Sequence, residues 1–197
     1  MRKKDEKTSR AGKEPTPLGY AVLGLIGIEP QSGYEVCKVF EETPMEVYSS
    51  SPGAIYPAIQ RLKALKLVAP EKAQGSDRNA RLVITARGRD VLVRWLTQPI
   101  TAGDVKRGLD QLMLRFAYME HFVPRGDLAR FLIAFNAAVE GHLGEVKRYY
   151  AQNAAATSLV GRLALEFGID SIAANLRWGQ SALAAIEAEA REKGEKP

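Results

Sequence analysis

Cysteine and histidine are scarce in this 197-residue chain, which contains only Cys37, His121 and His142. A single cysteine permits no internal disulfide, and these three residues make no zinc-ligand cluster. We therefore expect no metal site, no cofactor and a reducing, cytoplasmic setting. Because Cys37 lies among apolar positions of a helical pattern, we expect it to be buried rather than reactive.

Long apolar runs are missing as well. The longest, from Leu18 to Ile28, has 11 residues, whereas a membrane helix needs about 20. Its length would suit a secretory signal, but acidic residues and prolines interrupt the segment before it. The residues that follow, Glu29-Pro30-Gln31, do not form a small-residue cleavage site. We expect neither membrane insertion nor secretion.

The motifs of common enzyme classes are also absent. The sequence has no G-x-S-x-G elbow, no Walker-type glycine loop and no H-E-x-x-H zinc motif. Its carboxylate pairs, such as Glu41 and Glu42, are typical of a solvated helix surface. We therefore assign no catalytic residue and expect that the protein is not an enzyme.

What is present is a basic surplus with an uneven distribution. The chain is 46% hydrophobic and 26% charged, with a net charge of +5, which suits one or two globular domains. Between Arg61 and Arg94, nine basic residues face three acidic ones, a local surplus of +6. One side of one domain is therefore expected to meet an anion.

The chain divides into three predicted parts. Residues 1–14 are charged and nearly free of apolar side chains, which predicts a disordered basic tail. Residues 15–98 combine helical and strand patterns, whereas residues 99–197 are helical throughout. The boundary is the interruption between Thr97 and Gly103.

Residues 15–98 predict three helices, a hairpin and a fourth helix. The first helix begins at Thr16-Pro17, and the second ends before Pro44. The third begins at Ser49-Ser50-Ser51-Pro52 and continues to about Leu67 despite Pro57. Strand-like runs at 67–70 and 81–84 flank a basic, mobile tip, and Thr85 caps the fourth helix. This order is typical of a winged helix-turn-helix domain. The predicted fold is mainly α with one small β-hairpin.

Residues 99–197 predict long amphipathic helices. Apolar residues repeat at three- and four-residue steps from Leu128 to Tyr149, and a last helix runs from near Leu159 to Glu192 with a possible kink at Gly168. Such helices usually bury their apolar stripes against a partner, so we expect a helical dimerisation domain, with a monomeric bundle as the alternative. The dimerisation residues that we predict are Leu18, Val22, Leu128, Leu132, Phe135, Val139, Leu176 and Leu183.

The third helix is the candidate recognition element. If Ile55, Ile59 and Leu62 face the core, small and polar residues occupy the opposite face, which fits a DNA major groove. The basic hairpin tip can then contact the backbone or the minor groove. The predicted DNA-binding residues are Ser32, Tyr34, Ser50, Ser51, Gly53, Ala54, Tyr56, Gln60, Lys63, Lys72, Arg78, Asn79 and Arg81.

Four sequence blocks resemble the PadR-type transcriptional regulators. They are Ser-Gly-Tyr-Glu at 32–35, Ser-Pro-Gly-Ala-Ile-Tyr-Pro-Ala-Ile at 51–59, Arg-Leu at 61–62 and Ile-Thr-Ala-Arg-Gly-Arg at 84–89. The resemblance covers residues 17–98 and, more weakly, 104–190, where it suggests the longer members with a helical C-terminal domain. It implies a homodimeric repressor that binds a near-palindromic promoter site and is released by a small hydrophobic or aromatic effector.

The chain departs from the family pattern at two points. Where the family usually has Arg-Leu-Glu-x-x-Gly, this chain has Lys63 and Lys66 in place of the glutamate and the turn glycine. Where the wing of the family usually has two paired tyrosines, this chain has Leu82 and Val83. The helix-to-wing corner is therefore expected to differ, and attraction to a phosphate backbone to be stronger.

Trp95 is the candidate ligand-binding residue, because in small PadR-type proteins an aromatic residue in this region lines a pore for flat hydrophobic compounds. The alternative for Trp95 is a core or interface anchor. The alternative for the whole protein is a winged-helix scaffold for protein–protein contacts that does not bind specific DNA.

Overall fold

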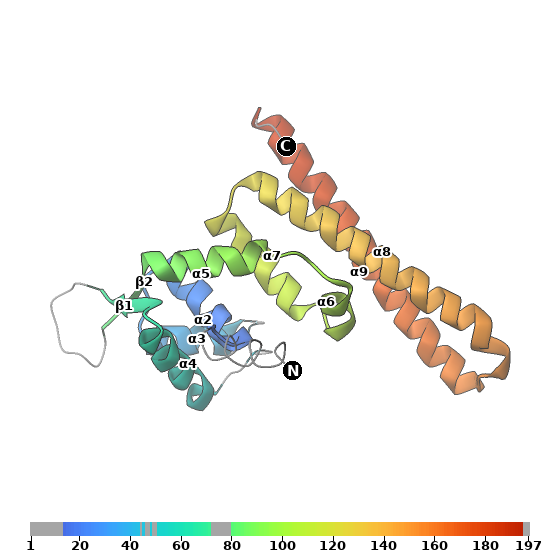
Figure 1. Ribbon diagram of the computed structural model, residues 1–197, viewed down its shortest axis with the longest axis horizontal. Coiled ribbons are helices and arrows are strands. Elements are labelled where there is room, and N and C mark those ends of the chain that lie inside the picture. The colour runs from blue at the N-terminus through green and yellow to red at the C-terminus, as the bar shows by residue number, and fades with distance from the viewer. Residues whose placement is uncertain (1–13, 44, 46–47, 49–50, 72–79, 195–197) are drawn as a thin grey trace, which may run out of the picture. The chain divides into compact units, whose positions relative to one another are not determined.

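The computed structural model describes residues 14–43, 45, 48, 51–71 and 80–194. The chain divides into two compact units, the first ending at Trp95 and the second beginning at Leu96, three residues before the predicted boundary. Both units are mainly helical, and the first contains a two-stranded sheet (Figure 1). The predicted fold class is confirmed. The tail predicted over residues 1–14 lies, apart from Glu14, outside the described residues.

Helix α2 (Pro17–Ile28) is the centre of the N-terminal unit. It begins as predicted, because Thr16 Oγ1 accepts a hydrogen bond from Gly19 N at 3.1 Å and Pro17 occupies the first helical position. Every residue from Gly19 to Ile26 is buried. Helices α3 (Gly33–Glu42) and α4 (Pro52–Ala64) pack against it. Cys37 of α3 is buried, as predicted.

Helix α4 ends three residues before the predicted end at Leu67. Leu65 closes the helix, and Lys66 adopts a left-handed backbone conformation with a φ of 58°. This residue turns the chain from α4 into strand β1. Pro57 lies in the second turn, and the helix continues through it, as expected for a proline so near the start.

Strands β1 (Val68–Pro70) and β2 (Leu82–Ile84) form the predicted antiparallel hairpin, with Val68 opposite Ile84. Gln31, between α2 and α3, adds an isolated bridge to Leu82. Helix α5 (Ala86–Thr97) follows, and Thr85 caps it as predicted, since its Oγ1 accepts from Gly88 N at 2.9 Å. The base of the hairpin is thereby attached both to the connection between α2 and α3 and to the start of α5.

The C-terminal unit consists of α6 (Ala102–Arg107), α7 (Asp110–Phe122), α8 (Arg125–Asn153), the 3₁₀ turn η2 (Ala154–Ala156) and α9 (Leu159–Glu192). Helices α8 and α9 run antiparallel and lie side by side (Figure 1). Helix α9 is continuous through Gly168, where the sequence predicts a possible kink. Helix α6 was not predicted; its first two residues lie in the segment assigned to the interruption. No helix in the described part of the chain is long and apolar enough to cross a membrane.

The pairing of α8 with α9 determines where four of the predicted dimerisation residues lie within the single chain. Leu128, Leu132, Phe135 and Val139 are buried within the single chain, because α9 packs along α8. Their apolar stripe therefore has its partner in the same molecule. Of the remaining predicted residues, Val22 belongs to the core of the N-terminal unit, and Leu18, Leu176 and Leu183 are half-buried.

Candidate nucleic-acid interface

Helix α4 presents one buried and one exposed face. Ile55, Ile59 and Leu62 are at most 2% exposed and form part of the core, which is the orientation that the sequence predicts. The 100° step between residues places a small and polar set on the opposite side. On that side Gly53, Tyr56, Gln60 and Lys63 are exposed and Ala54 is half-buried.

Helix α4 is also uniformly non-acidic. It contains no aspartate or glutamate, and Arg61 and Lys63 lie in its last turn. Arg61 Nη2 donates to the backbone oxygen of Glu14 at 3.1 Å. The exposed face of α4 therefore presents positive and neutral groups only, which favours an anionic partner.

The tyrosine of α4 rests on the first residue of α3. A Cβ atom at Gly33 would lie 2.7 Å from Tyr56 Cε1, so no larger residue fits at this position without moving the ring. Tyr56 is still 45% exposed, and Tyr34 beside Gly33 is 69% exposed. Two of the sequence blocks, at 32–35 and 51–59, thus meet here and leave two phenol groups facing outward.

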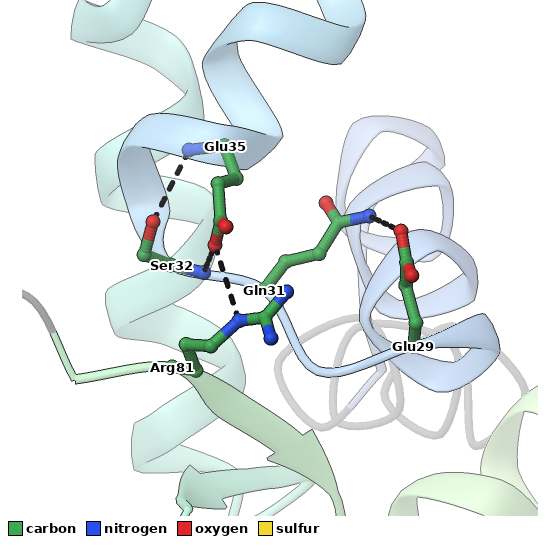
Figure 2. A network of polar contacts seen from close by, with 5 residues as sticks. All are labelled: Glu29, Gln31, Ser32, Glu35 and Arg81. Atoms are coloured by element: carbon green, nitrogen blue, oxygen red, sulfur yellow. Dashed lines mark hydrogen bonds and ion pairs between the residues drawn. The ribbon is translucent and has the colours of Figure 1, made fainter.

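A capping box forms the start of α3, and its glutamate also contacts the hairpin through Arg81 (Figure 2). Ser32 Oγ accepts from Glu35 N at 3.2 Å, and Glu35 Oε2 accepts from Ser32 N at 2.6 Å. The same carboxylate oxygen lies 3.4 Å from Arg81 Nε, immediately before β2. The hydrogen bonds from Ser32, and to a smaller extent Arg81, lower the pKa of Glu35.

These contacts assign structural roles to two predicted DNA-binding residues. The Ser32 hydroxyl caps α3, and Arg81 is bonded to α3 rather than projecting alone from the wing. Backbone bonds reinforce the connection: Gln31 N donates to Leu82 O at 3.2 Å and Leu82 N donates to Gln31 O at 2.8 Å. The sequence signal was present as Ser-x-x-Glu at 32–35, but Arg81 as its partner was missed, because no local pattern connects residues 46 positions apart.

The remaining predicted DNA-binding residues are placed only in part. Ser51 lies at the N-cap position of α4, where its side chain makes no capping hydrogen bond, while its backbone oxygen accepts from Ala54 N at 2.9 Å. The hydroxyl cap expected from the serine run is therefore not formed at Ser51. The predicted residues Ser50, Lys72, Arg78 and Asn79 lie outside the described residues.

Trp95, the predicted ligand-binding residue, is a packed ring. It stacks on Tyr20 with a centroid distance of 4.5 Å and an interplanar angle of 6°, and only 7% of it is exposed. Burial raises the pKa of the Tyr20 hydroxyl to about 12. Within the single chain, Trp95 is therefore positioned as a core anchor of α2 and α5.

The profile of the transcriptional regulator PadR-like family matches residues 22–94. This span contains α3, α4, the hairpin and nearly all of α5, and therefore every contact described above for Gly33, Tyr56, Glu35 and Arg81. Residues 22–94 thus form a domain that is similar to the PadR-like transcriptional regulators. Lys66 has a left-handed backbone conformation at the position where the PadR-type pattern usually has the turn glycine.

Solved PadR-like proteins resemble the chain over most of its length. The PadR-like regulator BC1756 from Bacillus cereus is 23% identical, with 87% of this chain and 99% of that chain covered and a TM-score of 0.38. Bacillus subtilis PadR in complex with operator DNA is 23% identical, with 86% and 98% covered and a TM-score of 0.38. The same protein in complex with p-coumaric acid is 22% identical, with 87% and 99% covered and a TM-score of 0.39. No curated protein matches the chain significantly.

Proposed function

We propose that this PadR-like protein is a cytoplasmic, sequence-specific DNA-binding repressor that acts as a homodimer on a near-palindromic promoter site. The observation that carries the proposal is the exposed face of α4, which is small, polar and free of acidic residues over its whole length. A helix has a diameter of about 10–12 Å, and the major groove is about 12 Å wide. Helix α4 can therefore enter the groove with Tyr56 and Gln60 toward the bases.

Each side chain of the face has a distinct proposed role. Ala54 can contact a thymine methyl group, Gln60 can bond to an adenine edge, and Lys63 can bond to a phosphate. Tyr34 and Tyr56, at the junction of α3 and α4, can donate their hydroxyls to the backbone or to a base. Ser32, Arg81 and the tip residues named above complete the proposed interface, with Ser32 and Arg81 positioning α3 and the wing.

Binding to duplex DNA at several salt concentrations tests this proposal. The probe is the DNA upstream of the protein's own gene, with a scrambled duplex as competitor. We expect tight, salt-sensitive and sequence-selective binding, because neutralised phosphates release counterions. Lys63→Ala should lower the salt slope by about one, whereas Gln60→Ala should also change sequence preference. Lys147→Ala, which removes an exposed cation of α8, is the control and should change neither.

The alternative is a winged-helix scaffold that binds protein instead of DNA. Equal and weak binding to both duplexes, unaffected by the α4 substitutions, would favour that alternative. Selective binding that Gln60→Ala alters would exclude it.

The proposed homodimer uses the outer face of α9. Leu159, Val160, Leu163 and Phe167 are each 55–75% exposed, and successive 100° steps place them on one side of the first three turns. Exposed apolar groups of this size in a contiguous row mark interaction surfaces. A second copy of the chain is the partner that the two-fold symmetry of a palindromic site requires.

Sedimentation equilibrium tests the dimer. Leu163→Glu should weaken self-association at least tenfold, because the new carboxylate would be desolvated in the interface. Ala184→Glu adds the same charge to an exposed position of the same helix outside the row and should leave the dimer intact. Dimers of equal affinity in both variants would place the interface elsewhere.

A further inference from the structure

A cavity of about 490 Å³ lies inside the C-terminal unit between α7, α8 and α9. Its volume falls within the range of small-molecule sites. Helix α7 contributes Phe116 and Glu120, α8 contributes Arg125 and Leu128, and α9 contributes Ile186 and Glu189. Apolar side chains thus line the cavity together with one charged group from each of the three helices.

The aromatic group of the cavity is held in a fixed position. The Phe116 ring packs on Phe131 at a centroid distance of 5.8 Å and against Trp178 at 5.7 Å with an interplanar angle of 89°. A ligand in the cavity therefore meets a ring that is supported by two others, and Trp178 is a built-in fluorescent reporter of contact with Phe116.

Two of the charged groups that line the cavity are paired with each other, and the third is not. Arg125 Nη2 donates to Glu189 Oε1 at 3.0 Å, and Lys193 Nζ donates to the same oxygen at 2.6 Å. Arg125 and Glu189 therefore form an ion pair, and Lys193, which does not line the cavity, contacts the same carboxylate. Glu120 is the third charged group that lines the cavity, and it has no ion pair or hydrogen bond to any residue within the described ranges.

Phe116 and Glu120 lie four residues apart on α7, so they are neighbours on one side of the helix. An aromatic ring beside a carboxylate recognises an ammonium group, because the ring face and the carboxylate both attract a cation. An anionic ligand would instead face the Glu120 carboxylate, and the Arg125 guanidinium is already paired with Glu189 through Nη2. We propose that this cavity binds an organic cation, an amine or quaternary ammonium carried on an apolar body.

The proposal identifies the chemical class of the effector. Only this effector role rests on the proposed repressor function; the binding of a cation does not. Binding of a cation to the purified protein requires no DNA. The two proposals can therefore fail separately: loss of DNA binding would leave the cavity occupied, and an empty cavity would leave the DNA interface unchanged.

Isothermal titration of the full-length protein tests the site with three matched probes: 4-phenylbutyltrimethylammonium, 4-phenylbutanol and 4-phenylbutanoate. We expect the cation to bind at least fivefold more tightly than the alcohol, and the carboxylate to bind most weakly. The emission of Trp178 should change on binding of the cation, because the indole contacts Phe116. Phe116→Leu keeps an apolar side chain but removes the ring face, and it should lower affinity for the cation more than for the alcohol.

Glu120→Gln is the decisive variant, because Glu120 is exposed and makes no contact that folding requires. It should reduce affinity for the cation about fivefold, as expected for loss of one solvent-accessible charge pair, and leave affinity for the alcohol unchanged. Glu140→Gln, an exposed carboxylate of α8 outside the cavity, is the control. Equal binding of cation and alcohol, preference for the carboxylate, no binding of any probe, or an unchanged affinity in Glu120→Gln would each overturn the proposal.

Discussion

Lys66 turns the chain from α4 into β1 in a backbone conformation that side chains disfavour. Its φ is 58°, and the left-handed region costs a non-glycine residue about 1–2 kcal/mol. Lys66→Gly should therefore raise the free energy of unfolding by about 0.5–1 kcal/mol, the remainder being offset by the greater freedom of glycine in the unfolded chain. Urea unfolding monitored by circular dichroism measures the change.

Lys66→Ala separates the backbone effect from the charge. Alanine keeps the cost of the left-handed conformation and removes only the ammonium group, so we expect no gain in stability. If alanine stabilised the protein as much as glycine does, repulsion among the basic residues of this region, rather than backbone strain, would be the cause.

At the scale of the element, the start of α3 depends on an ionised Glu35. Its pKa is lowered from 4.5, chiefly by hydrogen bonds from Ser32, so the charged form stabilises the folded state. That contribution is fully present above the usual pKa and is lost as the pH falls through the lowered one. Wild type should therefore be more stable than Glu35→Gln at pH 7, and the difference should shrink below about pH 4.5.

Thermal unfolding of both proteins from pH 7 to pH 3 tests this dependence. Glutamine can still accept the capping hydrogen bond, so the comparison isolates the charge. Arg81→Gln should reduce the pH dependence without abolishing it, because Ser32 is the larger cause of the lowered pKa. A stability difference that stays constant across the range would contradict the assignment.

The packing of α9 against α8 depends on the close approach of the two helices at Gly179. A Cβ atom at this position would lie 2.1 Å from Asn136 Oδ1 and 2.9 Å from the Phe135 ring. Gly179→Ala should lower the free energy of unfolding by about 1–3 kcal/mol, as overpacking usually does. It should also alter the near-ultraviolet signal of Trp178, which packs against Phe135.

Gly168→Ala is the matched control on α9. Nothing lies within 4 Å of a Cβ atom at that position, and alanine in a helix is favoured over glycine by about 1 kcal/mol. The control should therefore stabilise the protein, and a loss of stability there would mean that helix propensity does not govern α9.

The elements themselves could largely be predicted from the sequence, because their starts and stops are local. Thr16-Pro17 and Thr85 mark helix boundaries that the structure reproduces. What covers each apolar stripe could not be predicted. The repeat from Leu128 to Val139 indicates a buried face, but no periodicity distinguishes a second subunit from α9 of the same chain.

The candidate interface was predicted to a similar extent. The burial of Ile55, Ile59 and Leu62 follows from helical spacing, and that spacing sets the outer face of α4. The contact between Gly33 and Tyr56 and the bond between Glu35 and Arg81 join segments far apart in sequence. Such contacts depend on how α3, α4 and the hairpin pack, and that packing is not encoded in any single segment.

At the scale of the whole molecule, the two units each contain one tryptophan, Trp95 in the first and Trp178 in the second. The first buries its own core around α2, and the second buries the interface of α7, α8 and α9. Units with separate cores can unfold in separate transitions. We therefore expect a substitution that damages one core to change mainly the transition reported by its own tryptophan.

Gly88→Ala provides that damage in the N-terminal unit. A Cβ atom there would lie 2.0 Å from the backbone oxygen of Leu67, and a main-chain carbonyl cannot rotate away, so the cost should reach about 2–3 kcal/mol. In a Trp178→Phe background, where Trp95 reports, the urea midpoint should fall. In a Trp95→Phe background, where Trp178 reports, Gly88→Ala should leave the midpoint unchanged. Equal shifts of the urea midpoint with both reporters would show that the two units unfold in a single transition.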